Sequence, residues 1–156
     1  MEGAEMILKV KRLTETAKLP TKAHHDDAGY DLYSAEDFHL GAGEKYTVPT
    51  GIAISIPPGY HGEIRPRSGL ARKGIVVVLG TIDSGYIGEI GVMIYSRPCI
   101  YFPLTEPKLI ASGDFIRCGD RIAQLVIVKN ESPEIVEVSD LGQTNRGTNG
   151  FGSSGA

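Results

Sequence analysis

The stretch of residues 75–95, IVVVLGTIDSGYIGEIGVMIY, constrains the fold more than any other part of the chain. Two runs rich in Val, Ile and Leu flank Ser84-Gly85, a dipeptide that marks a tight turn. Because β-branched residues suit a pleated, half-buried surface, these runs predict a β-hairpin with its turn near 84–85. Asp83 ends the first run and Tyr86 follows the turn, so the tip suits a small-molecule pocket with a packing ring and an acid. The alternative is that Asp83 only opens the turn and Tyr86 is a surface residue.

The rest of the chain alternates short apolar runs with turn residues. Its 156 residues, enough for one domain, include 20 Gly and 9 Pro, which favours many strands and turns over helices. No predicted helix is long enough for a strand–helix–strand unit, so we expect an antiparallel barrel or sandwich of short strands. Pro49 and Gly51 indicate an edge or a bulge in one of these strands. Besides the hairpin, the apolar runs predict strands at 6–13, 30–35, 46–56, 121–129 and 134–138.

Two segments depart from this pattern. Residues 96–118 contain three prolines, which predicts a long excursion holding one strand. Residues 142–156 are rich in Gly and have too little apolar content to fold alone. We therefore expect a β core over residues 1–141, which includes the excursion, followed by a flexible tail.

Composition limits the function classes. The formal net charge of −3 gives no footprint for general nucleic-acid binding, so an anionic ligand would need a local cluster of Arg and Lys. No run approaches the ~20 apolar residues of a membrane span, and the N-terminus is too charged for a signal peptide. A soluble intracellular protein, cytoplasmic or nuclear, is expected. Cys99 and Cys118 form no CxxC motif, and free thiols are favoured over a disulfide.

Residues 67–74, RSGLARKG, predict the one helical turn, with Ser68 as its N-cap and Gly74 as its end. A helix N-terminus beside Arg67 suits a phosphate, although a plain surface turn has the same pattern. Gln124 interrupts the apolar run 121–129, so it is either a satisfied core amide or a ligand contact.

Two further motifs have weak signals. The tail letters at 150–155 match GxGxxG, but no strand precedes them and no helix follows, which excludes a dinucleotide fingerprint. Arg146 and Phe151 give that tail the means to fold over an anionic, ring-bearing ligand, unless it is simply a free terminus. The run His24–Asp27 lacks the spacing of a metal motif, which disfavours a protein-built zinc site. Asp31 differs from that run because it lies on a predicted strand.

Five segments, in order along nearly the whole chain, resemble the motifs of the trimeric dUTPases, the deoxyuridine triphosphate nucleotidohydrolases. They are AGYDLYSAED at 28–37, RPRSGLA at 65–71, GTIDSGYIGEIGV at 80–92, GDRIAQLVI at 119–127 and RGTNGFGSSG at 146–155. The resemblance implies an all-β, jelly-roll-like or β-clip barrel that assembles as a homotrimer with exchange of C-terminal tails. It also implies interfacial active sites that hydrolyse dUTP to dUMP and pyrophosphate with Mg²⁺ on the triphosphate. Such an enzyme limits uracil in DNA and supplies dUMP for thymidylate synthesis.

The resemblance also implies a role for individual residues. Asp83 matches the catalytic acid that activates the attacking water, and Tyr86 matches the ring packed on the deoxyribose. Asp31 matches an acid that meets the metal through water. The uracil-binding wall matches Val77, Gly80, Thr81, Ile82 and Gly91. The phosphate-binding positions match Arg67, Ser68, Gly69, Gln124 and Arg146, and the ring that covers the base matches Phe151 with Gly152.

The chain departs from the family at two places. Gly85 stands where many members carry an acid, and the 96–118 stretch is longer and richer in proline than usual. Two other functions stay open at this point. One is a catalytically silent dUTPase-like protein that binds a nucleotide or a regulatory partner. The other is a dCTP deaminase relative, which the hairpin and the tail disfavour.

Overall fold

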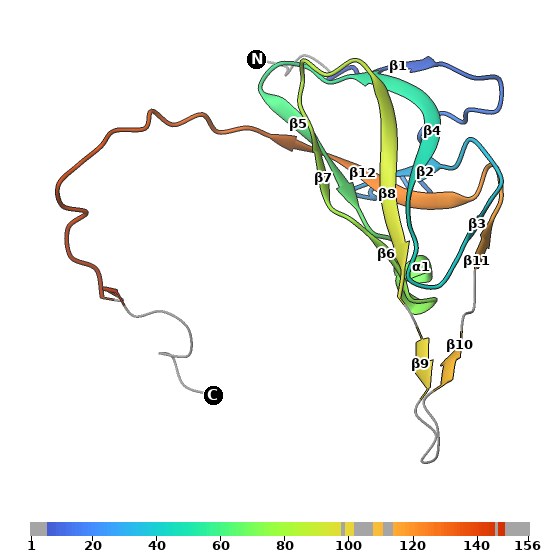
Figure 1. The fold of residues 1–156 in the computed structure, drawn as a ribbon. Helices are drawn as coiled ribbons and strands as arrows, with labels where there is room; N and C mark the ends of the chain where they lie inside the picture. The colour runs from blue at the N-terminus through green and yellow to red at the C-terminus, as the bar shows by residue number, and fades with distance from the viewer. Residues whose placement is uncertain (1–5, 98, 102–107, 111–113, 146, 149–156) are drawn as a thin grey trace.

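The computed structural model describes residues 6–97, 99–101, 108–110, 114–145 and 147–148. Over these residues the chain forms antiparallel strands and one short helix, as predicted (Figure 1). One sheet has the strand order β1-β4-β8-β6, a second has the order β2-β12-β5-β7, and β11-β3 and β10-β9 are separate pairs. The strands are β1 Lys9–Arg12, β2 Tyr30–Tyr33, β3 Phe38–Leu40, β4 Lys45–Ser55, β5 Tyr60–Arg65, β6 Ile75–Val77, β7 Gly80–Ile82, β8 Glu89–Ser96, β9 Cys99–Tyr101, β10 Lys108–Ile110, β11 Asp114–Ile116 and β12 Arg121–Lys129, and α1 is Ser68–Arg72.

The core lies between the two four-stranded sheets and takes alternate residues from each. In β8, Ile90, Val92 and Ile94 are buried while the residues between them are exposed or half-buried. Leu32 on β2 and Leu125 on β12 contribute from the other sheet, and both are fully buried. Burial of a side chain of this size stabilises the fold by about 1.5–3 kcal/mol, and in β8 the period-2 pattern places these residues on the inner face.

The predicted irregularity at Pro49 and Gly51 is a bulge within the long strand β4. Its register against β8 shifts between Pro49 and Ala53. Gly51 has a φ of 67°, and a Cβ there would lie 2.5 Å from the Thr14 hydroxyl, so a side chain is excluded on both counts. The bulge turns the Gly51 N–H toward the Glu89 carboxylate, which accepts it at 2.8 Å.

The predicted hairpin is confirmed at its base and at its turn, but it is open between them. β6 pairs with the end of β8, with Val77 opposite Ile94, and the Tyr86 N–H closes the turn onto the Asp83 carbonyl at 3.0 Å. In between, β7 leaves β8 and pairs with β5 in the other sheet, with Ile82 opposite Gly62. Prediction of continuous pairing was wrong because β5 offers an edge that no local pattern reveals.

The helix α1, Ser68–Arg72, is shorter than the predicted turn of 67–74, and its N-cap is one residue earlier than predicted. Arg67, in extended conformation, is the N-cap and makes no side-chain cap bond, so the prediction that Ser68 caps the helix was wrong. Gly74, with a φ of 82°, ends it as predicted. No helix in the described ranges is long and apolar enough to cross a membrane.

Two stretches differ from the sequence prediction. Within 96–118, β9 and β10 pair with each other and β11 pairs with β3, so the excursion holds more than the single strand predicted. Residues 134–138 form no strand, and their chain runs away from the sheets with the Ile135 side chain 96% exposed (Figure 1). A strand pattern there was misleading because the chain offers that segment no partner strand.

Candidate active site

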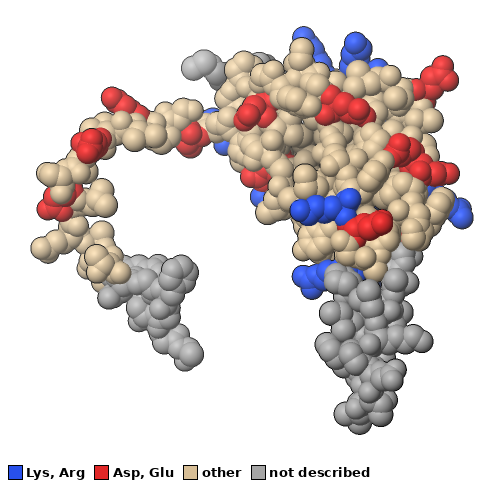
Figure 2. Space-filling view, viewed as in Figure 1, with Lys and Arg blue, Asp and Glu red and all other residues tan. Residues whose placement is uncertain are grey.

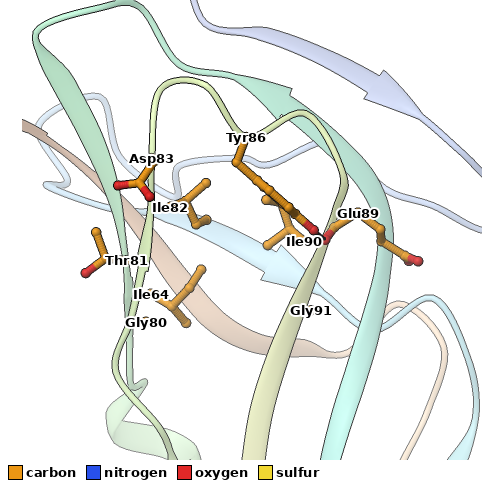
Figure 3. Close-up of a pocket in the computed structure, with 9 residues that line it drawn as sticks. All are labelled: Ile64, Gly80, Thr81, Ile82, Asp83, Tyr86, Glu89, Ile90 and Gly91. Carbon is orange, nitrogen blue, oxygen red and sulfur yellow. Dashed lines mark hydrogen bonds between the residues drawn. The ribbon is translucent and has the colours of Figure 1, made fainter.

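The opening between β7 and the start of β8 is a pocket of about 250 Å³. Its floor is apolar, from Ile64, Ile82 and Ile90, which come from three strands (Figure 3). Asp83 and Tyr86 lie on different sides of this floor, at the two ends of the turn. Such a volume suits one base with its sugar, since pockets for drug-sized ligands measure roughly 300–1,000 Å³. The lining residues are Ile64, Gly80, Thr81, Ile82, Asp83, Tyr86, Glu89, Ile90 and Gly91.

The acid and the ring differ in how they are held. Asp83 is exposed at the end of β7, where its carboxylate can reach water. Tyr86 is 48% exposed, and its hydroxyl donates to the Glu89 carbonyl at 2.8 Å. Glu89 was not among the predicted site residues, and only its position three residues after the ring hinted at this contact. The arrangement combines an exposed carboxylate, a hydrogen-bonded ring and an apolar floor.

A polar network lies on β5, next to the β7 edge of the pocket. The Glu63 carboxylate accepts from the Arg65 Nε at 2.8 Å and lies 3.3 Å from His61 Nε2. His61 Nδ1 bonds the Asn130 side-chain carbonyl, and this contact, with the Glu63 charge, raises the His61 pKa. Arg65 and then His61 lower the Glu63 pKa. Sequence reasoning missed this network, although the alternation of polar residues at 61, 63 and 65 was the available signal.

A second pocket, of about 190 Å³, brings together three residues from distant predicted motifs. Asp31, with 9% of its side chain exposed, lies opposite Gln124 across β2 and β12. Arg67 Nε is 2.9 Å from one Asp31 oxygen, as an ion pair without the alignment of a hydrogen bond. Arg121, which sequence reasoning did not single out, donates to the other oxygen at 3.3 Å. This pocket presents two guanidinium groups beside an amide, which is a surface for an anion.

A third pocket, of about 290 Å³, shares both arginines and adds cationic charge from Lys73. Gly69, a predicted phosphate-binding position, lines this pocket, whereas Ser68 lines none of the pockets described here and is exposed on α1. Val77 is buried in the core, with 3% exposure, so it is a structural neighbour of the hairpin pocket and not part of its lining. On the face shown in Figure 2, acidic and basic side chains are mixed without a broad patch of one sign.

The pocket between β7 and β8, here called the hairpin pocket, and the second pocket with Asp31, Arg67 and Arg121, here called the arginine pocket, are separate in a single chain. β7, which carries the first, and β2, which carries Asp31, are the two edges of one four-stranded sheet. At ~4.8 Å per strand, about 14 Å of sheet separates them. Arg146, Phe151 and Gly152 lie outside the described residues.

The donor set of the described residues suits a metal that arrives on a ligand better than one held in a protein cage. Within these ranges, no three His, Cys, Asp or Glu side chains gather in one place. Asp31 is the one predicted metal-related acid, and two guanidinium groups already neutralise its carboxylate. Its remaining lone pairs can accept hydrogen bonds from water, which fits contact through a hydrated Mg²⁺.

Comparison with known proteins gives one family. A sequence profile described as dUTPase matches residues 15–155. The deoxyuridine 5'-triphosphate nucleotidohydrolase of Mycolicibacterium gilvum is 47% identical over 156 residues, which cover 95% of this chain and 94% of that protein. The Arabidopsis thaliana protein of the same name is 44% identical over 149 residues, with coverage of 94% and 82%.

Solved structures agree with the sequence comparison. The Staphylococcus bacteriophage 80alpha dUTPase with dUPNHPP has a TM-score of 0.84 and 38% identity, over 96% of this chain and 99% of that one. A mutant dUTPase from phage phi11 of S. aureus, described with a coordinated structural Mg(II) ion, has a TM-score of 0.74 and 36% identity. The match with that mutant covers 86% of this chain and 98% of the phage chain.

Proposed function

Because this chain belongs to the dUTPase family, we propose that it is a dUTP diphosphatase, which hydrolyses dUTP to dUMP and pyrophosphate. The observation that carries the proposal is the opened hairpin, where Asp83 and Tyr86 border an apolar pocket the size of a base with its sugar. Such an enzyme lowers the supply of dUTP for DNA synthesis and provides dUMP for thymidylate synthesis.

The chemistry follows from what each group can do. The exposed Asp83 carboxylate orients a water and accepts its proton while the water oxygen bonds to the α-phosphorus. The bond from the α-phosphorus to the oxygen that bridges the α- and β-phosphates then breaks, and pyrophosphate leaves. A positioned general base contributes about 10²–10⁴-fold to the rate. Charge stabilisation and positioning by cationic groups supply the remainder.

The residues of the hairpin pocket also select the nucleoside. Uracil lies against the apolar floor, and the β7 edge from Gly80 to Ile82 offers backbone groups to its polar atoms. Gly91 on β8 keeps the opposite side open. Tyr86 packs on the deoxyribose and leaves no room for a 2′-hydroxyl, which would exclude UTP.

The phosphates are bound by the arginine side of the site. Arg67, with Ser68 and Gly69 at the start of α1, and Gln124 on β12 contact the phosphate oxygens, because guanidinium and amide groups are suited to them. Mg²⁺ bound to the triphosphate would neutralise phosphate charge, and Asp31 would accept a hydrogen bond from water on that ion. Asp31 also holds Arg67 and Arg121 in place through the ion pairs described above.

The active form is a homotrimer, in which each site combines the hairpin pocket of one chain with the arginine pocket of another. The separation of the two pockets in the single chain supports this arrangement. The tail that begins at residue 142 crosses to a neighbouring site, where Arg146 meets the γ-phosphate and Phe151, followed by Gly152, stacks on uracil. The exposed path of residues 131–145 away from the sheets is the observation that favours an exchange.

The test is pyrophosphate release from dUTP, dTTP, dCTP and UTP, each with Mg²⁺ and with a chelator. We expect Mg²⁺-dependent release from dUTP alone, and no ammonia from dCTP. Asp83→Asn should lower turnover about 10²–10⁴-fold while binding of a non-hydrolysable dUTP analogue persists. Asp26→Asn, which removes an exposed charge from a loop outside the hairpin pocket, is the control. Wild-type turnover in Asp83→Asn contradicts the assigned water-activating group, and a protein that binds without hydrolysis has the silent function instead.

A further inference from the structure

The Tyr86 ring lies directly against the backbone at Gly88. A Cβ built on Gly88 would lie 2.5 Å from the ring hydroxyl, 2.7 Å from Cζ and 3.0 Å from Cε2. Real Cβ atoms essentially never make contacts under 3.0 Å. The backbone of Gly88 is outside the left-handed region, so any residue could adopt its conformation. A side chain at this position would therefore require the Tyr86 ring to shift.

The carbonyl that receives the Tyr86 hydroxyl is itself fixed. The hydroxyl donates to the Glu89 carbonyl at 2.8 Å, and the Glu89 carboxylate accepts the Gly51 N–H at 2.8 Å. The next residue, Ile90, is held in the same way, because the buried Thr50 hydroxyl donates to its carbonyl at 2.6 Å. Both contacts come from the bulge in β4, so the bulge anchors the backbone on which the ring rests.

We propose that Gly88 is a positioning residue for sugar selection. Its missing side chain lets the Tyr86 ring lie flat and latch to the Glu89 carbonyl, which fixes the ring across the hairpin pocket. The inference rests on the proposed function and deepens it. A ring rejects a substrate with one extra hydroxyl only when the ring cannot move aside. An apolar surface that can move discriminates between substrates with and without that hydroxyl by about 10²-fold at most. Selection of deoxyribose over ribose thus depends on the surface behind the ring as well as on the ring.

Gly88→Ala tests this proposal against a matched control on the same turn. Gly85→Ala adds the same methyl group where nothing lies within 4 Å and where the backbone conformation is also unstrained. The measurement is kcat and KM for dUTP and for UTP in both variants. We expect the ratio of kcat/KM for dUTP to that for UTP to fall about 10-fold or more in Gly88→Ala. The KM for dUTP should rise while its kcat stays within a few-fold, because Asp83 lies on the other side of the turn. Gly85→Ala should keep the wild-type ratio.

A second variant removes the latch without adding volume. Tyr86→Phe keeps the ring and loses only the hydroxyl that bonds the Glu89 carbonyl, so the ratio should fall less than in Gly88→Ala. This variant decides the question if Gly88→Ala does not fold. An unchanged ratio in both variants, or a proportional loss with both substrates, overturns the proposal.

The wild-type assay distinguishes failure of the proposed function from failure of the role proposed for Gly88. If the wild-type protein does not hydrolyse dUTP, the proposed function fails, and the same variants are then compared by binding of non-hydrolysable dUTP and UTP analogues. Loss of preference for the deoxy analogue in Gly88→Ala would support the positioning role. Retained preference would overturn it.

Discussion

Replacement of Asp31 by Asn removes the shared counter-ion of Arg67 and Arg121. The Asp31 side chain is 9% exposed, that of Arg67 22% and that of Arg121 50%. Loss of one partner of a fully buried pair costs about 3–5 kcal/mol, whereas an exposed pair contributes about 0–1 kcal/mol. Because one arginine is half in solvent and the other largely covered, we expect Asp31→Asn to lower the free energy of unfolding by about 1–3 kcal/mol. At about 2–4 °C per kcal/mol for a domain of this size, Tm should fall by about 2–12 °C.

The assay is urea unfolding of wild type, Asp31→Asn and Asp26→Asn at one protein concentration, since assembly makes stability concentration-dependent. The midpoint should fall in Asp31→Asn with an unchanged slope, while Asp26→Asn, whose side chain is 99% exposed, should match wild type. The same proteins are then assayed for the KM of dUTP, which should rise in Asp31→Asn because both guanidinium groups lose their orientation.

Two readouts separate the two roles given to Asp31. An unchanged midpoint in Asp31→Asn refutes the ion-pair argument, whatever happens to turnover. The Mg²⁺ concentration for half-maximal rate reports the contact with the metal's water shell, and it should rise in the variant. If stability falls while that concentration stays constant, Asp31 acts only through the arginines.

The remaining predictions concern pH and the tail. Asn130, then Glu63, raise the pKa of His61 above its ordinary 6.5, so the stability that they provide is complete below pH ~6.5 and is lost as pH rises through the folded value. Asn130→Ala should lower the His61 pKa, measured by NMR titration of the imidazole C–H; a wild-type pKa at or below 6.5 contradicts the network. Removal of residues 146–156 should nearly abolish dUTP turnover with the trimer intact by light scattering, and full activity of the truncated protein would refute the closing role of the tail.

Local sequence patterns predicted the strands whose apolar residues are buried in the core. β12 is an apolar run interrupted by Gln124, with Ile122, Ala123 and Leu125 buried, and its bounds, 121–129, match the prediction. The segment 134–138 is also rich in Ile and Val but forms no strand, because a pattern shows that a segment can pair and not what it pairs with. The open hairpin has the same cause. β7 pairs with β5 rather than with β8, and that choice depends on an edge some 20 residues earlier in the chain.

The residues of the candidate site also fall into those that local sequence predicts and those that depend on long-range strand pairing. Asp83 and Tyr86 were predictable because turn chemistry alone places them at the hairpin tip. Arg121 was not, since its role depends on the register that sets β12 against β2 and brings it to Asp31, 90 residues earlier. Glu89 escaped notice because it acts through its carbonyl, which every residue has. The motif resemblance names residues from distant segments that no local pattern links, and their roles stay predictions. The Val77 side chain is buried, so a role for this residue in the uracil wall would have to come from its backbone.

The separation of the two pockets leads to a test of how the site is assembled. If Asp83 and Arg67 act in one site but come from different chains, then Asp83→Asn and Arg67→Ala each inactivate every site of their own trimers. In trimers mixed at random from the two variants, about a quarter of the interfaces join an intact Asp83 to an intact Arg67, given cyclic symmetry. Mixing by joint refolding should therefore restore about a quarter of the wild-type rate per site.

The control uses two residues of the same pocket. Asp83 and Tyr86 both line the hairpin pocket, so mixed trimers of Asp83→Asn and Tyr86→Ala contain no chain with an intact pocket and should stay inactive. Recovery with Arg67→Ala but not with Tyr86→Ala places the two pockets on different chains of one site. Absence of recovery in both mixtures, with mixed trimers verified by two affinity tags, means that Asp83 and Arg67 act within one chain. The hairpin and the arginine pocket would then have to approach each other across their own sheet when nucleotide binds.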